Sequence, residues 1–140
     1  MIKVDTKDIE ILKTLNAGDI VSISGTIYTA RDAAHKKIFA LMKDNEPLPF
    51  PLRNSFVYYT GATPAKDGEP YGSCGPTTSK RMDAYTPDML DAGLKGIIGK
   101  GARTRAVIDA IKRNGAVYFV AIGGAGAFYK SAIKSAEVIA

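Results

Sequence analysis

The sequence predicts an α/β fold, in which helices cover a mostly parallel sheet. Short segments of β-branched and aromatic residues alternate along the chain with longer segments whose apolar residues recur at helical spacing. Glycine and proline separate many of these segments, as they do where strands and helices end. The 140 residues fit one domain, and we find no internal repeat, low-complexity segment or domain boundary. We therefore expect a single domain over residues 1–140.

The first segments are predicted to be a short helix followed by a strand. Residues 6–15 carry Ile9, Leu12 and Leu15 at helical spacing, which predicts an amphipathic helix ended by Gly18. Residues 19–28 alternate Ile and Val with Ser, which predicts one continuous strand.

A capping box is predicted at the start of the next helix. Thr29 and Asp32 stand three residues apart before an alanine-rich segment, so their side chains are expected to satisfy the free amides of the first turn. This helix is expected to run to about Asn45. Three prolines then make residues 46–53 an extended connector, and residues 56–59 are predicted to form a strand.

The second half is predicted to continue the alternation of helices and strands. A loop over residues 61–76 contains four glycines and three prolines and is long enough to suggest a function. The segments expected after it are a helix over 79–85, a helix capped by Thr86 and ended by Gly93, a strand over 96–98, a helix over 102–113 stopped by Gly115, a strand over 116–122 and a final helix after the glycines at 123–126.

The charge of the chain is unevenly distributed. Lys and Arg number 19 against 14 Asp and Glu, a net charge of +5. Residues 1–70 hold nine basic and nine acidic residues, whereas residues 71–140 hold ten basic and five acidic ones. Much of the excess lies near glycines, at Lys80, Arg81, Lys95, Lys100, Arg103 and Arg105. A basic, glycine-rich face implies an anionic partner, either a small carboxylate or phosphate or a nucleic acid.

Several classes of protein are excluded by the composition. The one cysteine, Cys74, cannot form an internal disulfide or build a zinc or iron–sulfur site from this chain's thiols alone, and a lone thiol is typical of the reducing cytoplasm. The longest apolar run, residues 116–122, is shorter than the roughly 20 residues of a membrane helix. No signal-peptide pattern, catalytic Ser-His-Asp spacing or HExxH motif is seen. We assign no metal ligand to this chain and expect a cytoplasmic location.

Three predicted strand-to-helix turns place a basic residue beside free backbone amides, where α/β folds bind ligands. In the first, Arg31 falls in the first helical turn, where the helix dipole disfavours a cation. A carboxylate clamp explains that placement, and an exposed or ion-paired arginine explains it equally well. Asp32 is interpreted as a cap rather than a base. His35 is a candidate proton carrier, although a lone histidine is more often structural.

The second turn contains three consecutive hydroxyl groups followed by a Lys-Arg pair. Thr77, Thr78 and Ser79 follow a Gly-Pro corner and are suited to an anion. Arg81 lies four residues after Thr77, about one helical turn, so both side chains are expected to face one ligand. The alternative, that a threonine simply caps the helix, explains one hydroxyl and not three.

The third turn places Lys100 between two glycines, where no neighbouring side chain obstructs a ligand. This is not a phosphate-binding P-loop, because no Ser or Thr follows Lys100 and the glycine spacing differs. The later Gly124-Ala125-Gly126 begins a dinucleotide fingerprint, but Tyr129 stands where its third glycine belongs. We interpret these glycines as a tight turn.

Four motifs in order resemble class I (iron–sulfur) fumarases. GTIYTARDAAHKK, GPTTSKRMD, GLKGIIGKG and VYFVAIGGAGA, which span residues 25–127 with gaps, are similar to the C-terminal domain of these enzymes. They are equally similar to the separate β-subunit of two-subunit fumarases and L(+)-tartrate dehydratases. The resemblance implies a swivelling β/β/α domain.

The resemblance also implies a hydro-lyase that adds water reversibly to fumarate to give L-malate. An α-subunit or N-terminal domain of the family holds a 4Fe-4S cluster, and this chain would supply substrate contacts. Arg31, Arg81 and Lys100 match the family's carboxylate-binding residues, and Thr77 matches a residue near the reacting carbon. Because a threonine hydroxyl is a poor base, we assign Thr77 to positioning more than to proton abstraction. Cys74 is interpreted as a packing residue.

The reading that we favour is a fumarase β-subunit. The alternatives are an L(+)-tartrate dehydratase β-subunit, a non-catalytic module that binds anions or nucleic acid, and a stand-alone enzyme without a partner. The two β-subunit readings imply a hetero-oligomer with a cluster-carrying α-subunit and a small dicarboxylate substrate, without nucleic acid or membrane, and a β-subunit able to self-associate when isolated. Family β-subunits usually continue further past GGAGA, so we expect a shortened member or a fragment that acts only with its partner.

Overall fold

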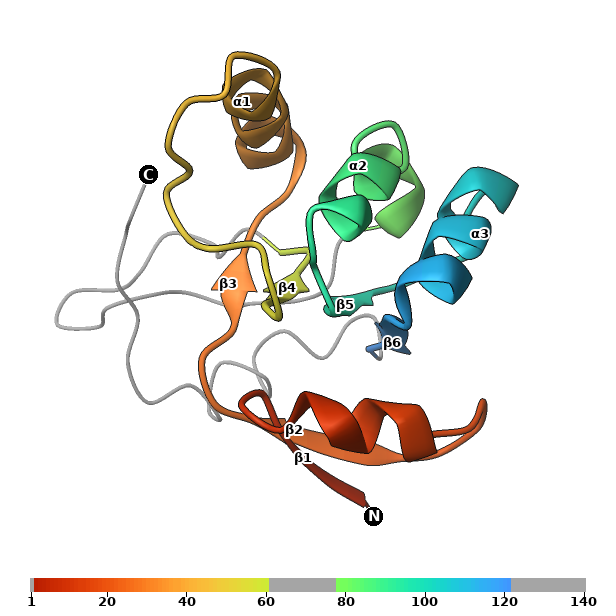
Figure 1. Ribbon diagram of the computed structural model, residues 1–140. Helices are drawn as coiled ribbons and strands as arrows, with labels where there is room; N and C mark the ends of the chain where they lie inside the picture. The colour runs from red at the N-terminus through yellow and green to blue at the C-terminus, as the bar shows by residue number, and fades with distance from the viewer. Residues whose placement is uncertain (1, 61–77, 122–140) are drawn as a thin grey trace, which may run out of the picture.

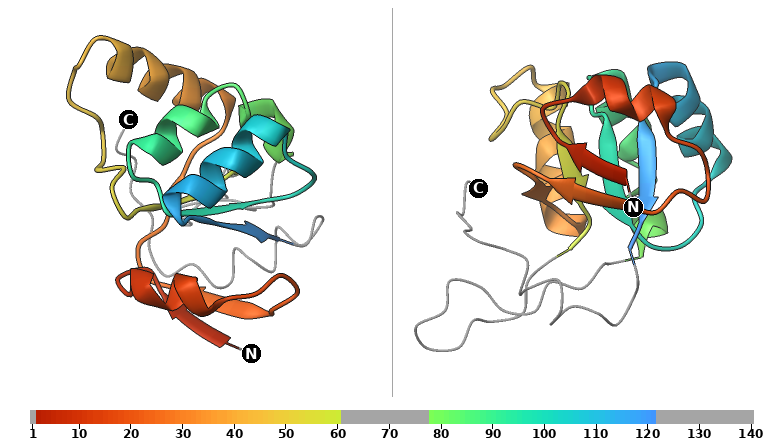
Figure 2. Two further views of the ribbon diagram at one scale, coloured as in Figure 1. Left: turned by 45° about the vertical axis from the view of Figure 1, so that its right-hand side comes forward. Right: turned by 90° about the horizontal axis from the view of Figure 1, so that it is seen from below.

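The computed structural model, which describes residues 2–60 and 78–121, has an α/β architecture in three layers (Figure 1). Three α-helices lie on one face of a four-stranded sheet, and a two-stranded sheet lies on its other face (Figures 1 and 2). The elements in chain order are β1 (Ile2–Asp5), the 3-10 helix η1 (Ile9–Thr14), β2 (Val21–Ser24), β3 (Tyr28–Thr29), α1 (Asp32–Lys43), β4 (Phe56–Tyr58), the 3-10 helix η2 (Ser79–Met82), α2 (Thr86–Asp91), β5 (Gly96–Gly99), α3 (Arg105–Asn114) and β6 (Val117–Val120). The predicted α/β class is confirmed.

The four-stranded sheet is entirely parallel, in the order β3-β4-β5-β6. Its register aligns Thr29, Tyr58, Ile98 and Phe119 across the four strands. Because the strands are parallel and in register, their carboxyl ends meet at one edge of the sheet. This edge carries the turns that the sequence singles out.

The two faces of this sheet bury two separate apolar clusters, because successive side chains of a strand point to opposite faces. Val57 and Ile97 pack toward the helices, with Ile38, Met89, Leu90 and Ala110. Phe56 and Phe119 pack toward the small sheet, with Val4 and Leu12. Because both faces of the sheet are covered, the central strands carry apolar side chains on both faces.

The strand predicted over residues 19–28 is wrong as one element. It divides into β2, which pairs with β1 in the small sheet, and β3, which belongs to the large sheet. Gly25 separates them with φ +121°, and a Cβ built there would lie 2.1 Å from Thr6 Oγ1, so the position requires glycine. Strand β1 was not predicted, because its four residues contain only two apolar side chains in alternation with Lys3 and Asp5.

Four further predictions about helices are corrected. Residues 6–15 hold the short 3-10 helix η1 rather than an α-helix, and the helix predicted over 79–85 is likewise reduced to η2. The capping box is wrong, because Thr29 ends β3, Arg31 is the N-cap of α1, and no side chain caps this helix. Thr86 does not cap α2 either, and its hydroxyl donates instead to the carbonyl of Met82.

Other boundaries match closely. Helix α3 ends at Gly115, whose left-handed φ of +62° closes the helix as predicted, and α1 and β5 lie within a few residues of their predicted ranges. The loop over 61–76 with Cys74, the glycines at 123–126 and the predicted final helix lie outside the described residues. Among residues 2–60 and 78–121, no helix is long and apolar enough to cross a membrane.

Candidate anion-binding site

Arg31 and Lys100 lie at the same level of the carboxyl edge of the large sheet. Each stands two residues beyond an aligned pair, since Thr29 of β3 and Ile98 of β5 are both in register with Tyr58. One strand separates them, so their backbones are about 10 Å apart by the usual spacing of strands. Both side chains are long and basic, and both start from this edge of the sheet.

Helix η2 enters the gap between these two residues. Successive carbonyls of a strand point to opposite neighbours, and the Ile98 carbonyl accepts from the amide of Tyr59, the residue that follows β4. The Lys100 carbonyl therefore faces the same side, beyond the end of β4, where it accepts the Ser79 amide at 2.9 Å. Thr78 forms a parallel bridge with Lys100 at this point. The start of η2 is thus fixed beside Lys100.

Arg81 of η2 completes the group and is tied to the first turn of α1. Its Nη2 donates to Asp32 Oδ2 in an ion pair that leaves the Arg81 side chain 59% exposed. Asp32 is therefore neither a cap nor an isolated carboxylate, which corrects the sequence interpretation. A guanidinium has five N–H donors, so this contact leaves donors for a second anion.

We call Arg31, Arg81 and Lys100 together the cationic edge. Within the described residues, neither the Arg31 nor the Lys100 side chain has a hydrogen bond or ion pair with the protein. The amides at the start of α1 also lack a side-chain cap, and the positive end of the helix dipole adds to the field. The arrangement suits a small anion with two negative groups.

The expected relation between Thr77 and Arg81 stays a prediction. Thr77 lies outside the described residues, and η2 begins only at Ser79, with Thr78 in an extended conformation at ψ 122°. The described part of this segment is helical only from Ser79 onward. The role of Thr77 remains a prediction from the resemblance.

His35 is buried in α1 and hydrogen-bonded, as the structural alternative expects. Its Nδ1 donates to the carbonyl of Arg31 at 2.9 Å, which leaves Nε2 as the unprotonated nitrogen, and Nε2 has no partner. The ring packs edge-on against Tyr59 and also contacts Tyr85. Burial is the largest cause that lowers the pKa of His35, and the Arg103 charge lowers it further, against the opposing effects of the Arg31 carbonyl and Asp32. His35 thereby holds the backbone of Arg31 while remaining neutral.

The lowered pKa of His35 predicts a pH dependence of stability. When the pH drops below 6.5, the ordinary histidine pKa, His35 binds a proton in the unfolded chain before it does so in the folded chain. The free energy of unfolding therefore decreases as the pH decreases, by at most about 1.4 kcal/mol per pH unit. Urea unfolding of wild type and His35→Asn between about pH 7.5 and about pH 5 measures this slope. The variant is expected to lose it, and an unchanged slope would contradict the assignment.

The structure also contains a buried ion pair that the sequence did not predict. The side chains of Arg103 and Asp83 are 2% and 7% exposed, and Arg103 Nε donates to Asp83 Oδ1 at 2.8 Å. Arg103 Nη2 donates to Tyr59 Oη and Thr86 Oγ1, each at 3.0 Å. Burial raises the pKa of Tyr59, whose hydroxyl keeps its proton and donates to Thr86 Oγ1. No spacing rule joins residues 20 apart in irregular segments, so the sequence carried no signal for this pair.

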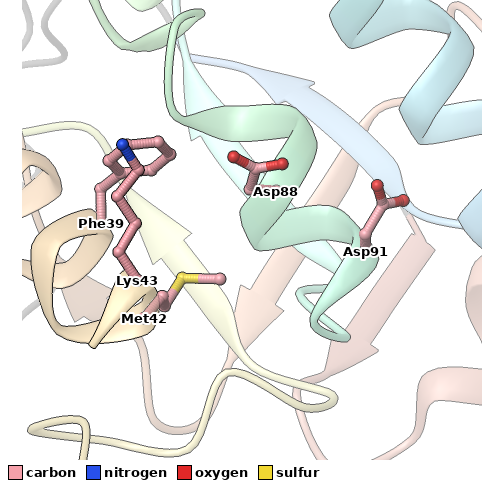
Figure 3. A pocket seen from close by; sticks show the side chains of 5 residues that line it. All are labelled: Phe39, Met42, Lys43, Asp88 and Asp91. Carbon is pink, nitrogen blue, oxygen red and sulfur yellow. The ribbon is translucent and has the colours of Figure 1, made fainter. Parts of the chain in front are cut away.

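A cavity among the described residues lies elsewhere. It is a shallow hollow of about 280 Å³ between the C-terminal half of α1 and helix α2, lined by Phe39, Met42, Lys43, Asp88 and Asp91 (Figure 3). They include none of the residues of the cationic edge. Within residues 2–60 and 78–121, no group of His, Cys, Asp and Glu could hold a metal ion.

The comparisons with known proteins identify the family. The family model described as Fumarase C-terminus matches residues 1–140. The chain belongs to this family.

Individual relatives differ in how much of their length the chain spans. It is 37% identical over 138 residues to "Putative L(+)-tartrate dehydratase subunit beta" of Methanocaldococcus jannaschii, which covers 96% of this chain and 69% of that protein. It is 40% identical to "Fumarate hydratase 2" of Leishmania major and 39% identical to "Fumarate hydratase class I, aerobic" of Escherichia coli K12, matches that cover 88% and 85% of this chain. Each match spans 22% of the fumarate hydratase, so the chain corresponds to one part of those enzymes.

Proposed function

We propose that this chain is the β-subunit of an iron–sulfur hydro-lyase that hydrates fumarate reversibly to L-malate. In this proposal it supplies the side chains that bind the substrate carboxylates. The observation that carries the proposal is the cationic edge, in which the family motifs place Arg31, Arg81 and Lys100 around one end of a parallel sheet. Membership of the Fumarase C-terminus family supports the reaction class.

The chemistry of a dicarboxylate matches these three cations. Each carboxylate gains a charge-assisted hydrogen bond worth about 1.5–3 kcal/mol. The Arg81 guanidinium is planar and suited to bidentate contact, whereas Lys100 offers a compact point charge on a flexible chain. Contacts at both ends of the molecule fix its central carbons in one orientation, which lowers the entropic part of the barrier. We assign Thr77 to positioning near the reacting carbon, on the resemblance alone.

The chain's own residues do not fit an iron–sulfur cluster. Such clusters are held mainly by cysteine thiolates, usually four, and this sequence has one cysteine. We therefore propose that a partner α-subunit holds the 4Fe-4S cluster and that the two chains form a hetero-oligomer. We also propose a cytoplasmic location, because a lone thiol persists in a reducing compartment.

L(+)-tartrate dehydration is the second candidate function. The relative named as a tartrate dehydratase β-subunit is a separate subunit, and the chain spans 69% of its length against 22% of two fumarate hydratases. Fumarate, malate and tartrate each carry two carboxylates, so the cationic edge suits all three.

The experiment is reconstitution of the chain with its α-partner under anaerobic conditions. Turnover of fumarate, L-malate and L(+)-tartrate is measured for the complex and for each chain alone. We expect turnover by the complex only, with the relative kcat/KM values deciding between the two substrates. No turnover of any of the three would refute the hydro-lyase proposal, and binding to random DNA with steep salt dependence would favour the nucleic-acid alternative.

A further inference from the structure

The backbone carbonyls of Gly99, Lys100 and Gly101 each accept a hydrogen bond from another part of the protein. The Gly99 carbonyl accepts the Ala121 amide at 2.8 Å, and the Lys100 carbonyl accepts the Ser79 amide. The Gly101 carbonyl accepts the Tyr118 hydroxyl at 2.8 Å, and Ser79 Oγ donates to that hydroxyl at 2.7 Å. Hydrogen bonds thus hold the backbone of Lys100 in place, while its side chain is unpaired within the described residues.

Arg103 and Asp83 connect the turn after Lys100 to the end of η2. Asp83 is the residue that ends η2, two positions after Arg81, and its second carboxylate oxygen accepts the Thr104 amide at 2.8 Å. Its first oxygen accepts Arg103 Nε. The turn that carries Lys100 and the short helix that carries Arg81 are therefore joined by one buried carboxylate.

The guanidinium of Arg103 is also held between two aromatic rings. Its central carbon lies 5.1 Å from the Tyr59 ring centroid and 4.9 Å from the Tyr118 ring centroid. Tyr59 follows β4 and Tyr118 belongs to β6, so the guanidinium bridges the end of the sheet. Its three hydrogen bonds use the fixed geometry of Nε and Nη2, which a lysine ammonium cannot reproduce.

We propose that Arg103 is a positioning residue, which acts with Asp83 to set the place of Lys100 relative to Arg81. It touches no substrate in this assignment, and its effect passes through the turn at residues 99–104. This inference rests on the proposed function for its catalytic consequence, because Lys100 and Arg81 are there the carboxylate contacts. A shift of about 1 Å in a group that positions the substrate is enough to lower the rate of the reaction.

The first test compares two Arg–Asp pairs in the reconstituted complex. Arg103→Lys keeps the charge and loses the planar fork, and we expect kcat/KM to fall at least about 10-fold. Arg113→Lys is the matched control, because Arg113 also bonds Asp91 through Nε and Nη2 but lies on the exposed surface of α3. Circular dichroism confirms that each variant is folded. A kcat/KM within about 2-fold of wild type for Arg103→Lys would overturn the proposal.

The second test separates positioning from general stability. If Arg103 acts through Lys100, then Arg103→Lys adds less than about a 2-fold loss in a Lys100→Ala background. A purely structural role predicts that the two losses multiply, and that result would overturn the proposal. Should Arg103→Lys fail to fold, Tyr118→Phe removes only the hydroxyl that holds Gly101 and is expected to lower kcat/KM about 3-fold. An unchanged Tyr118→Phe enzyme would then count against the proposal.

The third test needs no turnover and so stands apart from the proposed function. In the isolated folded chain, Arg103→Lys is expected to speed amide hydrogen exchange at Ser79 and Thr104 while leaving the amides of central α3 unchanged. Arg113→Lys is expected to change neither of the first two. If wild-type complex turns over none of the three dicarboxylates, the hydro-lyase proposal fails, and exchange alone decides whether Arg103 holds this turn. Unaltered exchange at Ser79 and Thr104 would refute it.

Discussion

Replacing Asp83 with alanine is expected to lower the free energy of unfolding by about 3–5 kcal/mol. The substitution leaves the buried guanidinium of Arg103 without its carboxylate, and Arg103 Nη1 already lacks a partner. It also removes the acceptor of the Thr104 amide. A charge stranded away from water costs far more than the loss of an exposed pair, so this is the largest effect on stability that we predict.

Urea unfolding monitored by circular dichroism measures this effect against a matched control. Asp91→Ala removes the carboxylate that Arg113 and Asn114 contact, but that pair is about half-exposed and is expected to cost at most about 1 kcal/mol. The double variant Asp83→Ala with Arg103→Met is expected to cost less than the sum of the single changes, because no buried charge remains. Equal losses for Asp83→Ala and Asp91→Ala would contradict this account of the buried pair.

Arg81→Ala and Lys100→Ala are each expected to reduce kcat/KM of the reconstituted complex by about 10-fold or more, equivalent to about 1.4 kcal/mol of transition-state binding. Each variant removes one of the protein cations that bind the substrate, and a dicarboxylate needs at least two of them. Because the Lys100 side chain is unpaired within the described residues and the Arg81–Asp32 pair is exposed, neither loss should change stability by more than about 1 kcal/mol.

Steady-state kinetics and urea unfolding on the same preparations check both halves of this expectation. Lys112→Ala is the control, since Lys112 lies in the last turn of α3, away from the carboxyl edge. It removes the same charge and should leave kcat/KM unchanged if the cationic edge acts by contact rather than through net charge. Unaltered kinetics in both Arg81→Ala and Lys100→Ala would remove the carboxylate-binding assignment.

The sequence predicted elements well where one local signal dominates. Helix α3 shows this, because its apolar spacing and the Asn114-Gly115 stop both come from nearby residues. The region from Asp19 to Tyr28 shows the limit, since alternation predicts extended backbone but does not say which sheet a residue joins. Only the close approach of Thr6 to Gly25, a tertiary contact, reveals the break.

The candidate site was predicted in its outline and missed in its support. Arg31 and Lys100 follow strands, and the rule that parallel strands end at one edge is enough to bring them together. The pairing of Arg81 with Asp32 was not predicted, because they are 49 residues apart and Asp32 also fits a local capping pattern. The same limit hid the Arg103–Asp83 pair, because an arginine and an aspartate 20 residues apart resemble ordinary surface charges until the fold buries them.

The bare backbone at Gly99 limits how this region can vary among related chains. A Cβ there would lie 2.1 Å from Ser79 Oγ and 2.9 Å from the Tyr59 ring. A larger residue at position 99 therefore requires the Ser79 hydroxyl or the Tyr59 ring to move, or a smaller residue at one of these two positions. Variation at these positions is thus constrained to occur in compensating combinations, and in natural sequences they should covary.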